Sequence, residues 1–377
     1  MRLYLLLIAF SFAASYLLTP MVRSAGHRFA AKQEVRERDM HDTPIVKFGG
    51  VAIVLSFLLG LWLASRFGFF SGVFGNTQAI TGLCLALAGV VVLGLLDDLF
   101  DLRWFIKFGG QVIIALMLPL HGIVVQAMPV GSWQIRETWM QVGVTVFLVV
   151  LTMNAINFSD GLDGLAAGLA SIGAATFFLY SYVLATHVRA EDYANFGALL
   201  CALLLGACLG FLPHNFNPAN IFMGETGVLA IGLVLSAAAI AVTGDVQGLE
   251  ARRFRNIPAF MPVVLPAVIM ALPFLDLVLS VVRRVSKGRS PFSADSGHLH
   301  HKMLSQGHSV RRAVVLLYLW ALVIAVVVVL FAFIPPNFVW PVLVVLFVGV
   351  AALTWQPLVV SWCKTLVKLV RKIRSRA

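Results

Sequence analysis

The chain has 377 residues, of which 60% are apolar and only 12% are charged, and its mean hydropathy is +0.93. Ordinary soluble domains are about 45–50% apolar and about 25% charged. These values exclude a water-soluble globular enzyme, and they also exclude a disordered chain, a coiled coil and a collagen. The class that remains is an all-α integral membrane protein that crosses the bilayer several times.

The net charge of +11 would suggest nucleic-acid binding in a soluble protein. Here the basic residues lie in short segments between apolar runs, which is the pattern of loops that face the cytoplasm. We therefore expect no nucleic acid as a partner. The expected partners of these basic segments are the anionic lipids of the inner leaflet.

Eleven apolar runs are long enough to cross the bilayer, because a spanning helix needs about 20 residues. We interpret the first run as a true span and not as a signal peptide, because the basic cluster follows it. Together they predict a single polytopic membrane domain over residues 1–377. The runs are residues 3–20, 46–67, 78–96, 106–120, 139–156, 164–185, 194–212, 227–243, 257–282, 313–334 and 338–362.

The distribution of basic residues predicts the orientation of these spans. An odd number of spans places the termini on opposite sides, and with the N-terminus in the periplasm 21 of the 28 Lys and Arg face inward. The C-terminus is then cytoplasmic. The inward segments are residues 21–47, 97–107, 157–163, 213–226, 283–312 and 363–377.

Two of the inward segments are distinctive. Residues 283–312 form a cytoplasmic loop rich in basic residues and histidine. Residues 363–377 alternate apolar and basic side chains, which indicates an amphipathic helix lying on the anionic inner surface. A frayed basic end is an equally good interpretation of that tail.

The few acidic residues gather on the inward side, first at the end of the third span. The sequence there is D-D-x-x-D, and on a continuing helix Asp97 and Asp101 would share a face while Asp98 points about 100° away. Carboxylates so close together repel unless a cation or a proton intervenes. The motif therefore offers one metal-facing and one proton-accepting role. The alternative is a solvated helix end that Arg103 and Lys107 neutralise.

The second polar segment, residues 154–164, joins the fifth and sixth spans. It contains the amides Asn154 and Asn157 and the carboxylates Asp160 and Asp163, each acid being followed by glycine. Such glycines indicate a tight loop whose backbone approaches a ligand closely. A structural turn capped by Asp is the alternative, but it leaves two amides and two acids together unexplained.

The third polar segment, residues 214–227, contains Asn217 and places Glu225 between glycines at the start of a span. Packing explains an acid in that position poorly. Mg²⁺ prefers one or two carboxylates, with substrate phosphates and water completing its octahedron. The pattern therefore points to a phosphorylated substrate.

The fourth segment, residues 290–301, ends in His298, His300 and His301 and follows Arg289. Three histidines could bind zinc, but the H-E-x-x-H pattern is absent and no cysteine is near. Histidines beside Arg and Lys fit an anion clamp better, so we favour phosphate binding.

In this order, the four segments resemble the polyprenyl-phosphate N-acetylhexosamine-1-phosphate transferases of glycosyltransferase family 4. The resemblance runs from residues 44–50 to His301, and rests on the D-D-x-x-D, N-A-x-N-x-x-D-G-L-D-G-L-A and P-A-x-I-F-M-G runs. It implies an eleven-span enzyme of the bacterial inner membrane with its active site on the cytoplasmic face.

The resemblance also implies the reaction. A UDP-N-acetylhexosamine, expected to be UDP-GlcNAc, would give its sugar-1-phosphate to undecaprenyl phosphate and release UMP, which starts O-antigen or a related envelope polysaccharide. A homodimer is a further expectation. The alternative function is an ion-coupled transporter of a phosphorylated solute, whose signature would be ionisable residues at mid-membrane in matched half-helices.

Residue roles follow from the resemblance alone. Asp97 looks like the base that deprotonates the acceptor, and Asp98 resembles a residue that organises metal or phosphate. Asn157 and Glu225 resemble ligands of Mg²⁺, for which Mn²⁺ is an expected substitute. A covalent aspartyl intermediate stays open as a second mechanism. The residues expected to contact substrate are Asp160, Asp163, Asn154, Lys107, Asn217, His298, His300, His301 and Arg289, with Asp163 resembling a residue that faces uracil.

Three positions depart from the family's usual pattern. Glu225 and Val228 stand where relatives usually have Asp and Ser, so the metal ligand is one methylene longer and a hydroxyl is lost. Ser296 stands where many relatives have Arg, which removes an expected phosphate contact. These changes could alter donor preference, weaken metal binding or mark a divergent subgroup.

Overall fold

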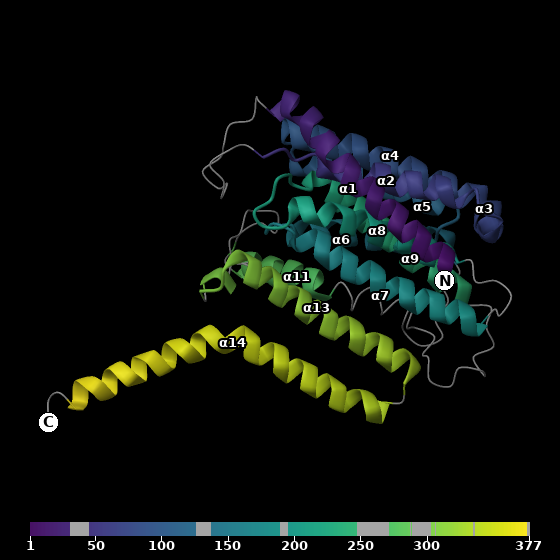
Figure 1. Cartoon of the computed structure of the whole chain (residues 1–377). Helices are drawn as coiled ribbons and strands as arrows, with labels where there is room; N and C mark the ends of the chain where they lie inside the picture. The colour runs from purple at the N-terminus through teal and green to yellow at the C-terminus, as the bar shows by residue number, and fades with distance from the viewer. Residues whose placement is uncertain are drawn as a thin grey trace.

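The computed structural model describes residues 1–30, 45–125, 137–188, 195–246, 271–286, 288, 303–305, 307–334 and 336–374. Within these ranges every regular element is a helix, which confirms the all-α class (Figure 1). The elements are α1 (Arg2–Ala30), α2 (Gly49–Ala64), the short 3₁₀ helix η1 (Gly68–Phe70), α3 (Ser71–Gly75), α4 (Thr77–Phe100), α5 (Trp104–Leu120), α6 (Thr138–Ser159), α7 (Leu165–Val188), α8 (Phe196–Asn215), α9 (Gly224–Val246), α11 (Ala271–Ser286), α13 (Val310–Phe333) and α14 (Pro336–Arg374).

The helices support a multi-pass membrane protein. In the described part of the chain, eight helices are long and apolar enough to cross a membrane, or nine if α2 and the bent continuation through η1 and α3 count as one span. Helix α5 is apolar but shorter. Every run predicted from the sequence overlaps a helix, wholly or in part. The count of eleven and the orientation remain predictions.

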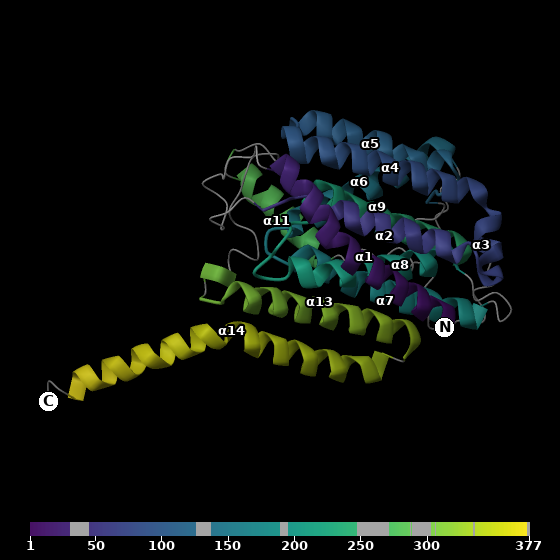
Figure 2. The same ribbon diagram turned by 45° about the horizontal axis from the view of Figure 1, so that its top comes forward.

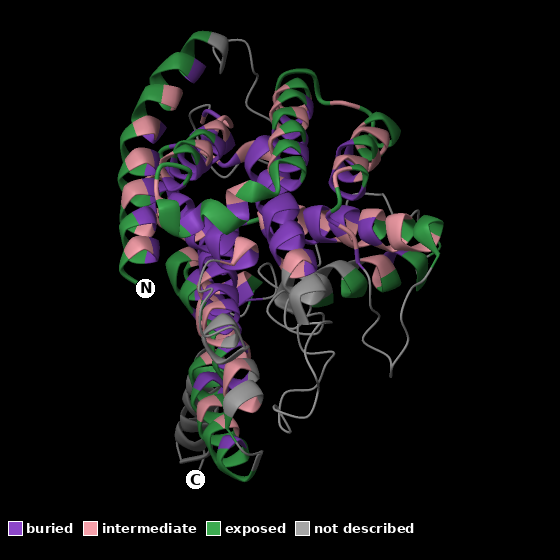
Figure 3. Cartoon of the chain, turned by 90° about the vertical axis from the view of Figure 1, so that its right-hand side faces the viewer, coloured by how far each residue is buried: buried purple, intermediate pink, exposed green. Residues whose placement is uncertain are grey.

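The centre of the bundle is formed by α8 and α9, which pack against each other and are buried along most of their length. Figure 3 shows the buried residues gathered in the middle of the bundle. Helices α1 and α7 pack on α8, while α4 and α6 pack on α9. Glycines allow the closest approaches. Gly50 of α2 lies against Gly227, and Gly94 of α4 lies against Thr226, so both neighbours contact the first turn of α9. Small residues at such crossings are typical of membrane helix packing.

The C-terminal helices lie at the side of the bundle opposite to α4 and α5 (Figure 2). Helix α13 packs on α7, and α14 packs mainly on α13. The first part of α14 exposes large apolar side chains such as Phe338 and Trp340, as expected of a surface that faces lipid. The predicted tail at residues 363–377 is helical as far as Arg374. Its contact with anionic lipids stays a prediction.

Candidate active site

The start of α9 is joined to the segment before α2 by backbone hydrogen bonds. Phe222 donates its N–H to Val46 O at 2.9 Å, Gly49 donates to Phe222 O at 3.0 Å, and Gly50 donates to Met223 O at 2.7 Å. These bonds satisfy backbone groups where both helices begin. They fix the position of Glu225, which follows directly in the first turn of α9.

Asp98 also belongs to this joint. Its carboxylate accepts the backbone N–H of Glu225, at 3.1 Å to Oδ1 and 3.2 Å to Oδ2. A carboxylate at a helix N-terminus is stabilised by the unsatisfied N–H groups and the helix dipole. Asp98 therefore caps α9 from α4. Its predicted role as a metal ligand remains a prediction.

Gly224 is essential to this geometry because its φ is +70°, a conformation that L side chains rarely adopt. An added Cβ would meet the Lys47 carbonyl oxygen and would lie 2.6 Å from Asp98 Oδ2. We expect Gly224→Ala to destabilise the protein by at least about 2 kcal/mol, because the left-handed conformation alone costs about 1–2 kcal/mol. Thermal unfolding in detergent would measure this.

The matched control for that substitution is Gly109→Ala in α5. An added Cβ there meets nothing within 4 Å, and alanine favours a helix by about 1 kcal/mol relative to glycine. We expect this control to be neutral or stabilising. Equal unfolding midpoints for the two variants would contradict the importance of Gly224.

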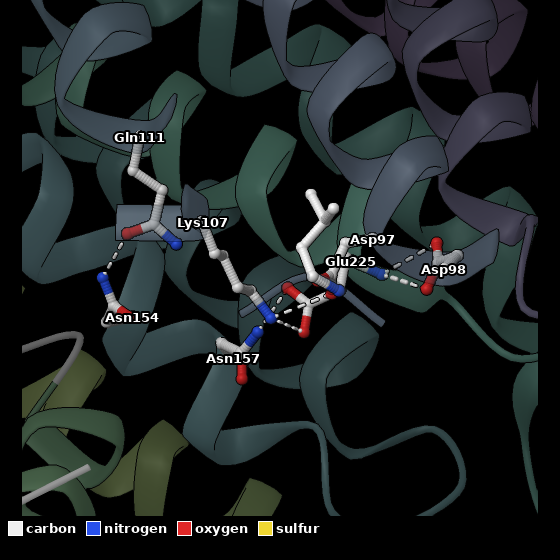
Figure 4. Close-up of polar contacts among 8 residues, drawn as sticks. Asp97, Asp98, Lys107, Gln111, Asn154, Asn157 and Glu225 are labelled. Atoms are coloured by element: carbon white, nitrogen blue, oxygen red, sulfur yellow. Dashed lines mark hydrogen bonds and ion pairs between the residues drawn. The ribbon is translucent and has the colours of Figure 1, made fainter. Parts of the chain in front are cut away.

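A cluster of charged groups from three helices forms the centre of the site (Figure 4). Lys107 Nζ of α5 lies 3.1 Å from Asp97 Oδ2 of α4 and also contacts Glu225 Oε1 of α9. Asn157 Nδ2 of α6 donates to Glu225 Oε2 at 2.6 Å. The side chains of Asp97 and Lys107 are only 10% and 23% exposed. Two carboxylates against one ammonium leave a net negative charge, which favours an additional cation.

Helix α4 ends immediately after Asp97 and Asp98, and this corrects one expectation. Asp101 is the C-cap, has a φ of +52° and donates its N–H to Asp97 O at 2.8 Å. It therefore leaves the helical path and does not share a helical face with Asp97. The Asp97 carboxylate instead accepts the Leu102 N–H at 3.1 Å, which fixes its orientation toward Lys107.

The second and third polar segments meet at Asp163. Its Oδ2 accepts the side-chain amide of Asn217 at 2.9 Å and the Ala219 N–H at 3.1 Å. Gly164 N–H donates to Asn215 Oδ1 at 3.1 Å. The sequence predicted that both segments contribute to one site, and these bonds bring them into contact.

Asp160 follows the C-terminus of α6 and is half-buried. Burial, with the negative charges of Glu225 and Asp163, raises the pKa of Asp160 from 3.8 to about 7. The unfolded chain ionises this group at much lower pH, so its ionisation costs native stability. That cost grows as the pH rises from about 4 to about 7 and is then constant.

Asp160→Asn should therefore raise the midpoint of thermal unfolding, and the gain should be larger at pH 8 than at pH 5. Wild-type protein scanned in the same buffers is the reference. An identical gain at both pH values would show that Asp160 does not have a raised pKa in the folded state.

Asn154 lies apart from the charged cluster (Figure 4). Its Nδ2 donates to Gln111 Oε1 of α5 at 2.7 Å and to Val150 O at 2.8 Å. Gln111 is fully buried, and sequence reasoning missed it although a polar residue within an apolar helix is itself a signal. Contact of Asn154 with substrate stays a prediction.

The remaining predicted substrate contacts, Arg289, His298, His300 and His301, lie outside the described residues, as does Ser296. Val228, where relatives usually have serine, is 2% exposed and packs in the core. The missing hydroxyl is therefore replaced by apolar packing in the second turn of α9.

The charged cluster fits a divalent ion that binds together with its substrate. Among the described residues, no group of three or more His, Cys, Asp or Glu side chains is arranged to hold a metal by itself. The oxygens of Asp97, Glu225 and Asn157 are nevertheless the donor type that Mg²⁺ prefers, with phosphates and water completing its coordination. The ammonium of Lys107 between two carboxylates shows that the cluster accommodates positive charge.

Acids, amides and a lysine gathered at the helix ends of an all-helical membrane bundle are groups that a membrane phosphotransferase needs, and relatives of this chain are named phosphotransferases. The chain belongs to glycosyl transferase family 4, as a polyprenyl-phosphate N-acetylhexosamine-1-phosphate transferase, and the family matches residues 80–243. This confirms the resemblance inferred from the motifs. The matched residues include the segments of Asp97, Asn157 and Glu225.

Curated relatives are similar along most of their length. The chain is 38% identical to the decaprenyl-phosphate N-acetylglucosaminephosphotransferase of Mycobacterium leprae, over 82% of this chain and 79% of the relative. It is 32% identical to the probable undecaprenyl-phosphate N-acetylglucosaminyl 1-phosphate transferase of Bacillus subtilis, over 84% and 82%. It is also 32% identical to the phospho-N-acetylmuramoyl-pentapeptide-transferase of Desulforudis audaxviator, over 84% and 94%.

Proposed function

We propose that this chain transfers GlcNAc-1-phosphate from UDP-GlcNAc to a polyprenyl phosphate, with undecaprenyl phosphate as the expected acceptor. The observation that carries this proposal is the cluster of Asp97, Lys107, Asn157 and Glu225, in a chain 38% identical to a relative named for N-acetylglucosaminephosphotransfer. Relatives named for the transfer of N-acetylglucosamine phosphate are 38% and 32% identical, and the relative named for phospho-N-acetylmuramoyl-pentapeptide transfer is 32% identical. The 38% identity is therefore what supports GlcNAc as the sugar.

The reaction joins two anions, so neutralising charge is the main task of the site. An oxygen of the acceptor phosphate attacks the phosphorus that bears the sugar, and the bond from this phosphorus to the bridging oxygen breaks. UMP leaves, and the product is a diphosphate-linked sugar lipid. In the proposed single-step route, Asp97 accepts the proton of the acceptor phosphate and Lys107 balances the charge that develops.

We infer that Glu225 and Asn157 hold Mg²⁺, with Asp98 of α4 beside them, where it accepts the backbone N–H of Glu225. The ion would supply electrostatic stabilisation of the diphosphate during transfer. Mn²⁺ is the expected substitute. We infer that Asp163 and Asn217 contact the nucleotide half of the donor, and their hydrogen bond to each other supports a shared role.

The proposed setting is the bacterial inner membrane, with the site on the cytoplasmic face and the product starting O-antigen or another envelope polysaccharide. The acids of the cluster lie at helix ends: Asp97 near the end of α4 and Glu225 in the first turn of α9. A transporter would need ionisable groups at mid-membrane in matched half-helices. The observed placement supports the enzyme.

Purified protein given a panel of radiolabelled UDP-sugars, with undecaprenyl or decaprenyl phosphate, tests the proposal. We expect labelled lipid from UDP-GlcNAc in the presence of Mg²⁺ or Mn²⁺ and none after chelation. If folded protein forms no lipid product with any of the UDP-amino sugars, the proposal is overturned. Product formed equally well after complete chelation would overturn the metal requirement alone.

A further inference from the structure

Helix α13 contacts both loops that meet at Asp163. Arg311 Nε donates a hydrogen bond to the backbone oxygen of Asn217, at 2.9 Å. About two helical turns further along α13, the Tyr318 hydroxyl donates to the backbone oxygen of Gly164. One helix thus contacts the loop between α6 and α7 and the loop between α8 and α9.

These contacts continue to the carboxylate of Asp163. Asn217 accepts from Arg311 with its backbone oxygen and donates with its side-chain amide to Asp163 Oδ2, at 2.9 Å. Asp163 directly precedes Gly164, whose oxygen accepts from Tyr318. The carboxylate is therefore held through Asn217 on one side and through its own backbone on the other.

The Tyr318 contact is built into the packing of α13 on α7. An added Cβ at Gly168 would collide with the ring of Tyr318, so the absence of a side chain there gives the ring its place. Tyr318 also packs against the apolar cluster that joins α13 with Leu165 and Leu169 of α7. The helix is thus placed firmly enough to hold the loops.

We propose that Arg311 is a positioning residue for the nucleotide half of the donor, and that Tyr318 supports it from the same helix. The inference rests on the proposed function, because it takes Asp163 and Asn217 to contact the donor. It adds a fifth element, α13, to a site whose central cluster comes from α4, α5, α6 and α9.

The position of these contacts predicts which step they affect. The carboxylate of Asp97 accepts from Leu102 and Lys107, and neither of these bonds involves α13. Loss of Arg311 would free the Asn217 carbonyl and loosen the amide that orients Asp163, without changing the Asp97 and Lys107 pair. We therefore expect weaker donor binding with little change in turnover at saturating donor.

The test compares Arg311→Ala with Arg312→Ala as a matched control. Arg312 is the next residue on the same helix and is also exposed. It donates a hydrogen bond to Gln356 of α14 and not to the loops that follow α6 and α8. We expect Arg311→Ala to raise the KM for UDP-GlcNAc by about 10-fold or more, which is the usual effect of losing a hydrogen bond from a charged group such as guanidinium. The kcat and the KM for polyprenyl phosphate should change by less than about twofold, as for a change that affects only the binding of UDP-GlcNAc.

Two further variants separate positioning from general loosening. Arg311→Lys retains a positively charged group that can donate a hydrogen bond to Asn217, so it should recover part of the affinity for UDP-GlcNAc. Tyr318→Phe keeps the ring in place at Gly168 and removes only the hydroxyl, so it should raise the donor KM by a smaller factor. If Arg311→Ala does not yield folded protein, the lysine and phenylalanine variants decide.

Binding of UMP by titration calorimetry gives a readout independent of turnover. We expect UMP to bind the wild type and Arg312→Ala equally and to bind Arg311→Ala about 10-fold more weakly. An equal loss in both arginine variants, unchanged affinity in Arg311→Ala, or no UMP binding to the wild type would overturn this inference. Wild-type protein that binds UMP but forms no lipid product would overturn the proposed function alone.

Discussion

Asp97→Asn is expected to lower turnover by about 10²–10⁴-fold, the usual contribution of a general base. Asparagine has nearly the same size and can still accept the Leu102 N–H, so the local fold should persist. It cannot take a proton from the acceptor phosphate, and it loses the ion pair with Lys107. Initial rates of lipid product formation at saturating UDP-GlcNAc would measure the loss, and UMP binding should change little.

Asp101→Asn is the matched control because it makes the same exchange within the same motif. Asp101 is exposed and occupies the C-cap of α4, beyond the helical face of Asp97. We expect turnover close to that of the wild type. Full activity in Asp97→Asn would remove Asp97 from the role of base, and an equal loss in both variants would point to the charge of the motif as a whole.

Glu225→Gln is expected to have the second large effect. Glutamine keeps one acceptor oxygen for Lys107, and its NH₂ group can donate to Asn157 once the Asn157 amide turns over, so the fold should survive. The site nevertheless loses one of its two central negative charges. If Glu225 holds Mg²⁺, activity at low Mg²⁺ should fall by roughly 10²-fold or more, since the metal supplies several kcal/mol of charge stabilisation. Titration of activity with Mg²⁺ would show the curve displaced to higher concentration.

Glu225→Asp separates the charge from the length of the side chain. It restores the residue that the family usually carries and keeps the negative charge, so we expect it to retain the Mg²⁺ response. The shorter side chain weakens the reach to Lys107 and Asn157, which predicts a decrease smaller than that of Glu225→Gln. An unchanged Mg²⁺ response in Glu225→Gln would contradict the assignment of Glu225 as a ligand.

The convergence of Asp97, Asn157 and Glu225 was predictable from the sequence. Each lies at the end of an apolar run on the side with most basic residues, and hydropathy fixes such ends to within a few residues. Their meeting in one hydrogen-bonded cluster confirms that expectation. The same simple pattern identified the spans, because a helix in lipid must be apolar over its whole length.

Other features depend on tertiary structure that local patterns do not encode. Helical periodicity placed Asp101 on the face of Asp97, but α4 ends in a left-handed cap just before that face is completed. The pairing of Asn154 with Gln111, and of Arg311 with Asn217, joins residues that are distant in the chain. Gln111 is notable as a polar residue within an apolar helix, but neither pairing has a sequence signature, since the bonds are set by how the helices pack.

The most direct test of phosphosugar transfer is the identity of the nucleotide released. Purified protein with UDP-GlcNAc, undecaprenyl phosphate and Mg²⁺ should form UMP and diphosphate-linked GlcNAc lipid in equal amounts, both measured by mass spectrometry. This follows because the bond that breaks lies between the two phosphorus atoms of the donor. Release of UDP with a monophosphate-linked sugar lipid would contradict the account, because the sugar would then have moved without its phosphate.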